Sequence, residues 1–170
     1  MTNKLYILCG LPFSGKTTLA KILVSKLNFT RIDLDEIKFS LFGNNITDDE
    51  IDQNGWDKVY LQIYQNIERE LELGNTVVYD TGNFTKNERT LVKNIADKLA
   101  IESITIFVSI PEDIAYQRLI NNRVNPIRFN VTDEDFKNTI KELEVPDNSE
   151  KHLVFNYNED INSWIDKNLK

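Results

Sequence analysis

The feature that most constrains this chain is the stretch from Gly10 to Thr17, which has the spacing G-x-x-x-x-G-K-T. A short apolar run over residues 4–9 precedes it, and residues 18–27 carry apolar side chains at helical spacing. A strand, a glycine-containing turn and a helix in this order form the setting in which the pattern binds phosphate. The sequence therefore predicts a phosphate-binding loop, the P-loop, close to the N-terminus.

Each defined position of this loop has a physical reason. Gly10 and Gly15 allow backbone conformations that a side chain obstructs, so that successive N–H groups and the positive end of the next helix face one anion. Lys16 is expected to reach the β- and γ-phosphates of a nucleotide, and the Thr17 hydroxyl to bind the bridging Mg²⁺. The alternative is a simple turn with Lys16 in solvent. The residues expected to contact the nucleotide are Gly10, Leu11, Pro12, Phe13, Ser14, Gly15, Lys16, Thr17 and Thr18.

Length and charge narrow the class of protein. The chain has 170 residues and a formal net charge of −7, from 20 basic and 27 acidic residues. The length predicts a single domain, residues 1–170. The negative charge argues against a broad nucleic-acid surface, so a polyphosphate must be held by a local group of cations. The sequence has no apolar stretch of membrane-spanning length and no signal-peptide pattern, which predicts a cytoplasmic protein without a membrane partner.

Strand and helix patterns alternate along the whole chain. The expected strands end at Cys9, Leu34, Asp80, Val108 and Tyr157. This alternation predicts an α/β fold of three layers, in which a five-stranded parallel sheet is covered by helices on both faces. Open sheets of this kind bind ligands outside the carboxyl ends of their strands.

Two carboxylates follow expected strand ends, where a ligand would bind. Asp35 stands just after the second strand, and Asp80 closes the third. In a functional interpretation Asp35 faces the substrate, and Asp80 orients Mg²⁺ or a catalytic side chain. The alternatives are local, because Asp35 suits the dipole at a helix N-terminus and Asp80 is a common turn former.

Residues 43–56 form a polar and acidic segment with a capping box from Thr47 to Glu50. We expect a solvated surface segment. The alternative is a flap on the substrate side, whose acidity would suit a cationic or amine-bearing acceptor. In the helix that follows, Tyr60 and Tyr64 are expected to pack into the core rather than to stack on bases.

Basic residues gather at Arg118, Arg123 and Arg128. We expect approximately residues 118–131 to form a lid whose arginines neutralise a triphosphate. The alternative is a solvated cationic helix end, which the helix dipole favours. Arg89 lies in the first turn of another expected helix, where the dipole disfavours a cation, so another attraction is expected to hold it there.

Over nearly its full length the chain resembles the small P-loop kinases that include the polynucleotide 5′-kinase domain, chloramphenicol phosphotransferase and the zeta-type toxin kinases. The resemblance is carried by Gly10–Thr18, Asp35, Lys38, Asp80–Asn83, Arg89, Arg118 and Arg123. It implies that Asp35 is the base that accepts the proton of the acceptor hydroxyl, and that Lys38 holds the substrate or Asp35. It also implies that Arg123, with Arg118, stabilises the transferring phosphoryl group from the lid.

The resemblance places three further residues, Asp80, Asn83 and Arg89, on the substrate side. Two departures from the family pattern matter. Lys38 stands where an arginine is common, and a point charge in place of a bidentate fork weakens the case for an acceptor phosphate. Gly82 lengthens the usual Asp-Thr-Asn sequence, which makes the role of Asn83 less secure than that of Asp80.

The sequence thus predicts an ATP-dependent, Mg²⁺-assisted phosphotransferase that moves the γ-phosphoryl group to a hydroxyl of a small molecule or nucleotide. ATP is favoured over GTP because the chain has no Asn/Thr-Lys-x-Asp pattern. The alternatives are an ATP-hydrolysing nucleotide-binding switch and a toxin-like kinase of a nucleotide sugar. The identity of the acceptor and the oligomeric state do not follow from the sequence.

Overall fold

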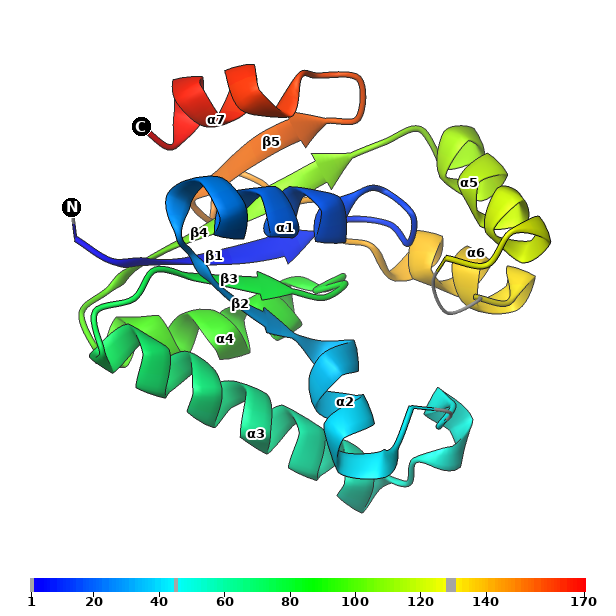
Figure 1. Cartoon of the computed structure of the whole chain (residues 1–170), viewed down its shortest axis with the longest axis horizontal. Coiled ribbons are helices and arrows are strands. Elements are labelled where there is room, and N and C mark those ends of the chain that lie inside the picture. The colour runs from blue at the N-terminus through cyan, green and yellow to red at the C-terminus, as the bar shows by residue number, and fades with distance from the viewer. Residues whose placement is uncertain (1, 45, 128–130) are drawn as a thin grey trace.

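A parallel β-sheet runs through the centre of the structure (Figure 1). The computed structural model describes residues 2–44, 46–127 and 131–170. Within them the strands are β1 (Lys4–Cys9), β2 (Thr30–Asp33), β3 (Val77–Asp80), β4 (Glu102–Ser109) and β5 (His152–Asn156). Their order is β2-β3-β1-β4-β5, and each neighbouring pair is parallel. The predicted three-layer α/β fold is confirmed.

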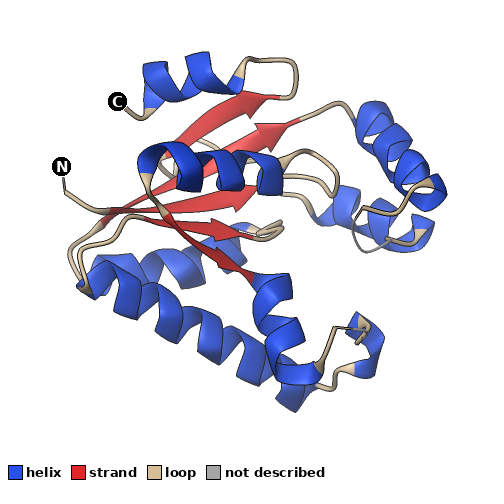
Figure 2. Ribbon diagram, in the orientation of Figure 1, coloured by secondary structure: helices blue, strands red, loops and turns tan. Residues whose placement is uncertain are grey.

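Helices alternate with the strands, as Figure 2 shows by colour. The helices of the described residues are α1 (Lys16–Leu27), α2 (Leu34–Phe42), the 3₁₀ turn η1 (Asp48–Glu50), α3 (Gln53–Glu72), α4 (Lys86–Lys98), α5 (Glu112–Val124), α6 (Asp133–Glu142) and α7 (Ile161–Asn168). Helices α1 and α7 cover one face of the sheet, and α3 and α4 cover the other (Figure 1). Between them they bury two apolar layers against the strands.

The second strand ends one residue earlier than predicted. Asp33, not Leu34, is its last residue, and the Asp33 carboxylate accepts a hydrogen bond from the Glu36 backbone N–H at 2.8 Å. This N-cap starts α2 directly after the strand. Asp35 therefore lies in the first turn of α2, as the helix-dipole interpretation of this residue expected.

The face covered by α3 is built from apolar residues four positions apart. Val59, Ile63, Ile67 and Leu71 are buried against β1, β2 and β3. The spacing matches the helical period, which explains why a helix with charged residues on its other side packs there. Tyr60 and Tyr64 each follow a residue of this stripe by one position, so they lie beside it.

A third apolar cluster supports the P-loop from the side of α5 and α6. Leu11 and Phe13 of the loop pack with Ala115 and Leu119 of α5 and with Phe136 of α6. Phe13 has a positive φ of 64°, a conformation that is costly for a bulky side chain. The buried contacts of its ring offset this cost and fix the shape of the loop.

Two capping boxes set where helices begin, the predicted one at Thr47 and a second one at Thr85. Thr85 and Glu88 exchange hydrogen bonds at the start of α4, with the Thr85 N–H 2.8 Å from the Glu88 carboxylate. Thr47 and Glu50 form the same reciprocal arrangement at η1. Each box satisfies N–H groups that a helix end leaves without partners. None of the helices in the described residues is long and apolar enough to span a membrane.

Candidate functional site

The P-loop connects β1 to α1 and has the geometry of an anion cradle. Gly10 has a φ of +144°, and a Cβ atom there would lie 2.6 Å from the Val108 carbonyl oxygen, so only glycine fits. Gly15, at φ +108°, is the N-cap of α1 and makes no side-chain cap. The first N–H groups of α1 are thus left for another acceptor, and a phosphate is the anion that helix N-termini commonly bind.

The two polar side chains that end the motif lie at the mouth of this cradle. The Lys16 ammonium donates hydrogen bonds to the carbonyl oxygens of Gly10 and Leu11, each at 2.7 Å. The Thr17 hydroxyl lies 3.3 Å from a carboxylate oxygen of Asp80 at the end of β3. The strand-end carboxylate and the P-loop hydroxyl therefore meet, as an Asp that orients Mg²⁺ requires.

Asp80 belongs to a buried charge network that the sequence did not predict. The Arg31 guanidinium on β2 donates to Asp80, with Nε 2.8 Å from a carboxylate oxygen, and also pairs with Asp33 and Glu36. Arg31 thus bridges the ends of β2 and β3 and fixes the orientation of Asp80. Burial raises the pKa of Asp33 to about 6, despite the Glu36 N–H and Arg31, and the charges of Asp80 and Asp35 add to the rise.

This raised pKa predicts a pH dependence of stability. A carboxyl group whose pKa is higher in the folded than in the unfolded state stabilises the fold at low pH, and the contribution is lost as pH rises through the folded pKa. Raising the pH from 5 to 7.5 should therefore lower the free energy of unfolding by about 1 kcal/mol through Asp33. Asp33→Asn keeps a good N-cap residue and should flatten this part of the profile. Urea unfolding of both proteins at the two pH values measures it, and parallel profiles would contradict it.

Asp35 and Lys38 lie one helical turn apart on α2. The Lys38 ammonium is 3.2 Å from the Asp35 carboxylate and 2.6 Å from that of Asp48 in η1. Burial alone lowers the pKa of Lys38, but the hydrogen bond to Asp48 and the charge of Asp35 outweigh it and raise the pKa, so the ammonium stays charged. Lys38 is buried, whereas the Asp35 carboxylate is half exposed. Lys38 thus positions Asp35 and anchors the acidic segment.

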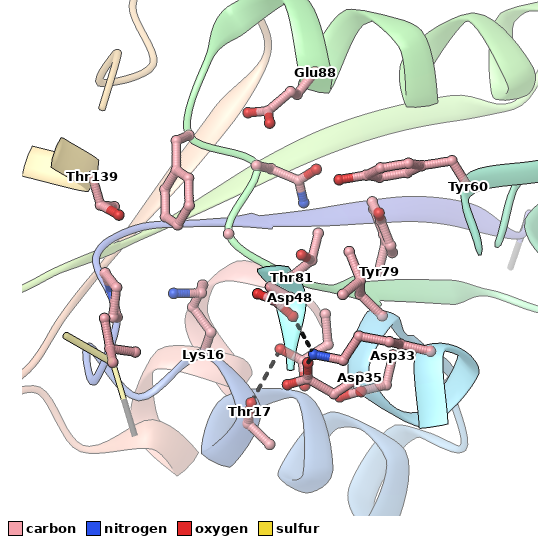
Figure 3. Close-up of a pocket in the computed structure, with 18 of the residues that line it drawn as sticks. Lys16, Thr17, Asp33, Asp35, Asp48, Tyr60, Tyr79, Thr81, Glu88 and Thr139 are labelled. Atoms are coloured by element: carbon pink, nitrogen blue, oxygen red, sulfur yellow. Dashed lines mark hydrogen bonds and ion pairs between the residues drawn. The ribbon is translucent and has the colours of Figure 1, made fainter. Parts of the chain in front are cut away.

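A cavity of about 980 Å³ joins these groups (Figure 3). Lys16, Thr17 and Asp35 line one part of it. The remaining wall comes from the acidic segment, α3, β3 and the loop after it, α4, and the segment that enters α6, and it includes Asp48, Asp49, Trp56, Tyr60, Tyr64, Tyr79, Phe84, Glu88, Asp135 and Thr139. The volume is at the upper end of those typical for small-molecule sites. The part of this cavity away from the P-loop, with Tyr60, Tyr64, Tyr79 and Glu88 in its wall, is called the chamber below. A cavity of this size can hold one ligand at the P-loop and a second ligand in the chamber.

Two expectations concern this wall. Most described residues of the 43–56 segment are exposed, as expected for a solvated surface segment, and Asp48, Asp49 and Trp56 also line the cavity. Residue 45 lies outside the described residues. Tyr60 and Tyr64 pack against the core as expected, and because they lie beside the buried stripe of α3 they also line the cavity.

The two lid arginines occupy different positions. Arg118 donates to the carbonyl oxygens of Phe13 and Ser14 at 3.1 and 3.3 Å, so it holds the P-loop from the side of α5. Arg123 instead pairs with Asp133 at 2.7 Å and donates to the Val131 carbonyl. Neither arginine is among the described residues that line the cavity. Residues 128–130 of the expected lid, with Arg128, lie outside the described residues.

Asn83 and Arg89 are placed as structural residues. Asn83 has a positive φ of 44°, and its side chain donates to the Leu8 carbonyl at 2.8 Å, which ties the loop after β3 to β1. The Phe84 ring packs over Gly82, where a Cβ atom would lie 2.2 Å from it. This contact explains the extra glycine. Asn83 still lines the cavity wall.

The expectation that Arg89 contacts substrate does not agree with its position. Only 2% of Arg89 is exposed, and its guanidinium pairs with Glu150 at 2.6 Å. It also donates to the carbonyls of Asn83 and Phe84. The ion pair with Glu150 stabilises Arg89 at a helix end where the dipole disfavours a cation. The two residues are far apart in the chain, so sequence spacing does not indicate this pair. Among the described residues, Arg89 does not line the cavity that contains Lys16 and Asp35.

Mg²⁺ fits the residues at the mouth of the P-loop. The described residues contain no group of three carboxylate, imidazole or thiol side chains that could hold a metal alone. The Thr17 hydroxyl and the Asp80 carboxylate are nevertheless adjacent, and both are oxygen donors of the type that Mg²⁺ prefers. Such a site takes its remaining ligands from water and nucleotide phosphates, as is usual for Mg²⁺ in phosphoryl-transfer proteins.

The fold and the cradle together define a P-loop nucleotide-binding protein. Its sequence matches the model of the AAA domain family over residues 5–146. Because the match covers most of the chain, the chain belongs to this family. No curated protein matches the sequence.

Solved structures with the same fold come from several organisms. Kti12 of Chaetomium thermophilum, in complex with ADP-AlF3, has a TM-score of 0.78 at 17% identity, covering 96% of both chains. A provisionally assigned kinase of Chloroflexus aurantiacus has a TM-score of 0.76 at 20% identity, covering 99% of this chain and 96% of that one. The APS kinase CysC of Mycobacterium tuberculosis, with AMPPNP and APS, has a TM-score of 0.70 at 16% identity, covering 99% and 96%. At these identities the likeness shows the fold, and it agrees with the predicted group of small P-loop kinases.

Proposed function

We propose that this protein is an ATP-dependent kinase that transfers the γ-phosphoryl group to a hydroxyl group of a small molecule. The observation that carries the proposal is that Lys16 and Thr17 of the P-loop share one cavity with the Asp35 carboxylate. Donor and acceptor groups of a phosphotransferase must face each other in this way. The structural neighbours include proteins named as kinases, which supports the same class.

The donor half of the site consists of the P-loop and the start of α1. The N–H groups from Gly15 to Thr18 would bind phosphate oxygens, and Lys16 would leave the loop carbonyls to neutralise the charge on the transferring group. Mg²⁺, bound by Thr17 and oriented by Asp80, would screen the negative charge of the phosphates. Arg118 supports the loop from outside through its carbonyl groups.

The acceptor half is centred on Asp35. Its carboxylate would accept the proton of the acceptor hydroxyl as the oxygen attacks the γ-phosphorus atom and the bond to the β-phosphate oxygen breaks. The Lys38 ammonium pairs with the Asp35 carboxylate and also with Asp48. Asp80 and Asn83 would complete the wall beside the transferring group.

A lid over the site remains part of the proposal. Residues 118–131 carry Arg123, whose guanidinium is now paired with Asp133 at 2.7 Å. For Arg123 to stabilise the transferring phosphoryl group, this exposed pair must open and the segment must move toward the P-loop. Exposed ion pairs contribute only about 0–1 kcal/mol, so the exchange for a phosphate contact is energetically accessible.

The experiment that tests the proposal follows the phosphoryl group itself. The protein is incubated with ATP labelled with ¹⁸O in the γ-phosphoryl group, Mg²⁺ and the pooled small-molecule extracts of several cell types. Mass spectrometry then identifies labelled compounds. We expect a labelled organic phosphate monoester that is absent with Lys16→Ala protein. Label found only in inorganic phosphate would contradict the proposal and favour an ATP-hydrolysing switch.

A further inference from the structure

The chamber beyond the P-loop has an unequal balance of charge. Among the described residues that line the cavity, the carboxylates are Asp33, Asp35, Asp48, Asp49, Asp80, Glu88 and Asp135. The lining cations are Lys16 and Lys38, none of the described lining residues is an arginine, and Arg31 pairs with Asp33 and Asp80 from outside the lining. Lys16 serves the donor phosphates, and Lys38 already contacts two carboxylates. An acceptor with a phosphate or sulfate group would meet repulsion here without a compensating cation.

The part of the chamber away from the P-loop holds a carboxylate among aromatic rings. Glu88 lies across from Tyr60 on the side away from Thr17 (Figure 3). Its Oε2 atom serves the capping box with Thr85, whereas its Oε1 atom accepts no hydrogen bond from the described residues. Burial, and next the charge of Glu88, raise the pKa of Tyr60 to about 12, so its phenol stays neutral. Among the described residues no cationic side chain pairs with the Glu88 carboxylate.

A second observation at the same place is independent of charge. Tyr79 is only 1% exposed and lines the cavity, yet its hydroxyl makes no hydrogen bond with any described residue. The hydroxyl is not among the fully buried atoms of the described residues that lack a partner, so it is open to the cavity. Burial raises the pKa of Tyr79 well above its usual value, and the neighbouring Tyr60, Tyr64 and Glu88 add to the rise. The neutral phenol oxygen can therefore accept a hydrogen bond from a ligand in the cavity.

We infer that the phosphoryl acceptor is an amine-bearing alcohol, whose ammonium group lies between Glu88 and the rings of Tyr60 and Tyr64 while its hydroxyl lies at Asp35. The inference rests on the proposed kinase activity. An ammonium group supplies the cation that Glu88 lacks, and aromatic faces attract cations in desolvated sites. A neutral alcohol would leave the carboxylate unpaired, and an anion would be repelled by it.

The test begins with the acceptor found by ¹⁸O-labelled transfer. A labelled product whose precursor carries a protonated amine supports the inference. A precursor that is anionic or has no amine overturns it while leaving the kinase activity intact. If label appears only in inorganic phosphate, the proposed function itself fails, so the two failures are distinct.

A cycle of variants and substrates then tests the position of the amine. In the wild type, N-acetylation of the acceptor should raise KM at least about tenfold, as for a lost charged hydrogen bond, with kcat changed less than about twofold. Glu88→Gln keeps the capping box and should raise KM for the amine by a similar factor. N-acetylation should then have no further effect in this variant. Equal losses on acetylation in both proteins would overturn the placement.

Two further variants keep the result decisive. Glu68→Gln removes the same charge from an exposed position of α3 outside the cavity and should leave KM unchanged. Tyr79→Phe removes only the unpartnered hydroxyl and should raise KM at least about threefold, as for a neutral hydrogen bond. If Glu88→Gln fails to fold, Tyr79→Phe carries the test in its place. An unchanged KM for Tyr79→Phe would then overturn the assignment of the chamber to the acceptor.

Discussion

Lys16→Ala is expected to abolish phosphoryl transfer and also to weaken nucleotide binding. The ammonium is the P-loop cation that faces the cavity, and no described arginine lines the cavity to replace it. Loss of one charge-stabilising donor typically lowers a transfer rate by about 10² to 10³ or more. Loss of a charged hydrogen bond to phosphate should raise the Kd for ATP by about 10- to 100-fold. Single-turnover transfer and calorimetric titration with ATP measure the two effects.

The control for this variant must separate charge from loop shape, because Lys16 also bonds to the carbonyls of Gly10 and Leu11. Lys21→Ala removes a lysine from the same helix at an exposed position outside the cavity. It should change neither transfer nor ATP affinity. Wild-type ATP affinity in the Lys16→Ala protein would contradict the assignment of Gly10 to Thr17 as the nucleotide site.

Asp35→Asn is expected to abolish transfer while leaving ATP affinity within about twofold of the wild type. The substitution keeps the shape of the side chain but removes the base, and positioned general bases contribute about 10² to 10⁴ to rate. Asp35 lies on α2, outside the P-loop, so its loss should not disturb nucleotide binding. The same two assays measure the separation of effects.

Asp97→Asn serves as the matched control for this variant. It removes an exposed carboxylate near the end of α4, outside the cavity, and should leave both quantities unchanged. If Asp35→Asn lost ATP affinity as strongly as Lys16→Ala, Asp35 would belong to the nucleotide site and the reason for treating it as the base would disappear. Transfer at the wild-type rate would remove that role as well.

Local sequence signals were sufficient for the fold and for the geometry of the P-loop. The P-loop spacing carries its own strand, turn and helix, and the capping boxes at Thr47 and Thr85 mark helix starts through contacts only three residues apart. The meeting of Thr17 with Asp80 also followed from sequence, because parallel strands end at the same edge. Each of these inferences depends on short-range geometry or on a general property of parallel sheets.

The features that were missed depend on contacts between distant elements. The alternating pattern of β2 suggests that Arg31 faces solvent. In the structure Arg31 forms ion pairs with Asp33 on its own strand and with Asp80 on β3. Arg89 finds its partner in Glu150, 61 positions later. For Arg89 the signal in the sequence was a cation in the first turn of a helix, and it does not name a partner.

The chamber for the acceptor was the hardest feature to predict. Tyr60 and Tyr64 follow the period of a packed helix, so their spacing favoured the core. Whether such a residue faces a core or a cavity depends on how far the neighbouring helices stand from it, which the period does not encode. Glu88 completes the capping box at the start of α4, and this local role gives no sign of its position in the cavity wall.

The measurement that tests the central claim most directly is a crystal structure with ADP, Mg²⁺, aluminium fluoride and the acceptor identified by labelled transfer. We expect the acceptor hydroxyl to lie in line with the fluoride mimic of the phosphoryl group and about 2.6–3.2 Å from the Asp35 carboxylate. An acceptor bound away from Asp35, or a water molecule alone in line with the mimic, would contradict it.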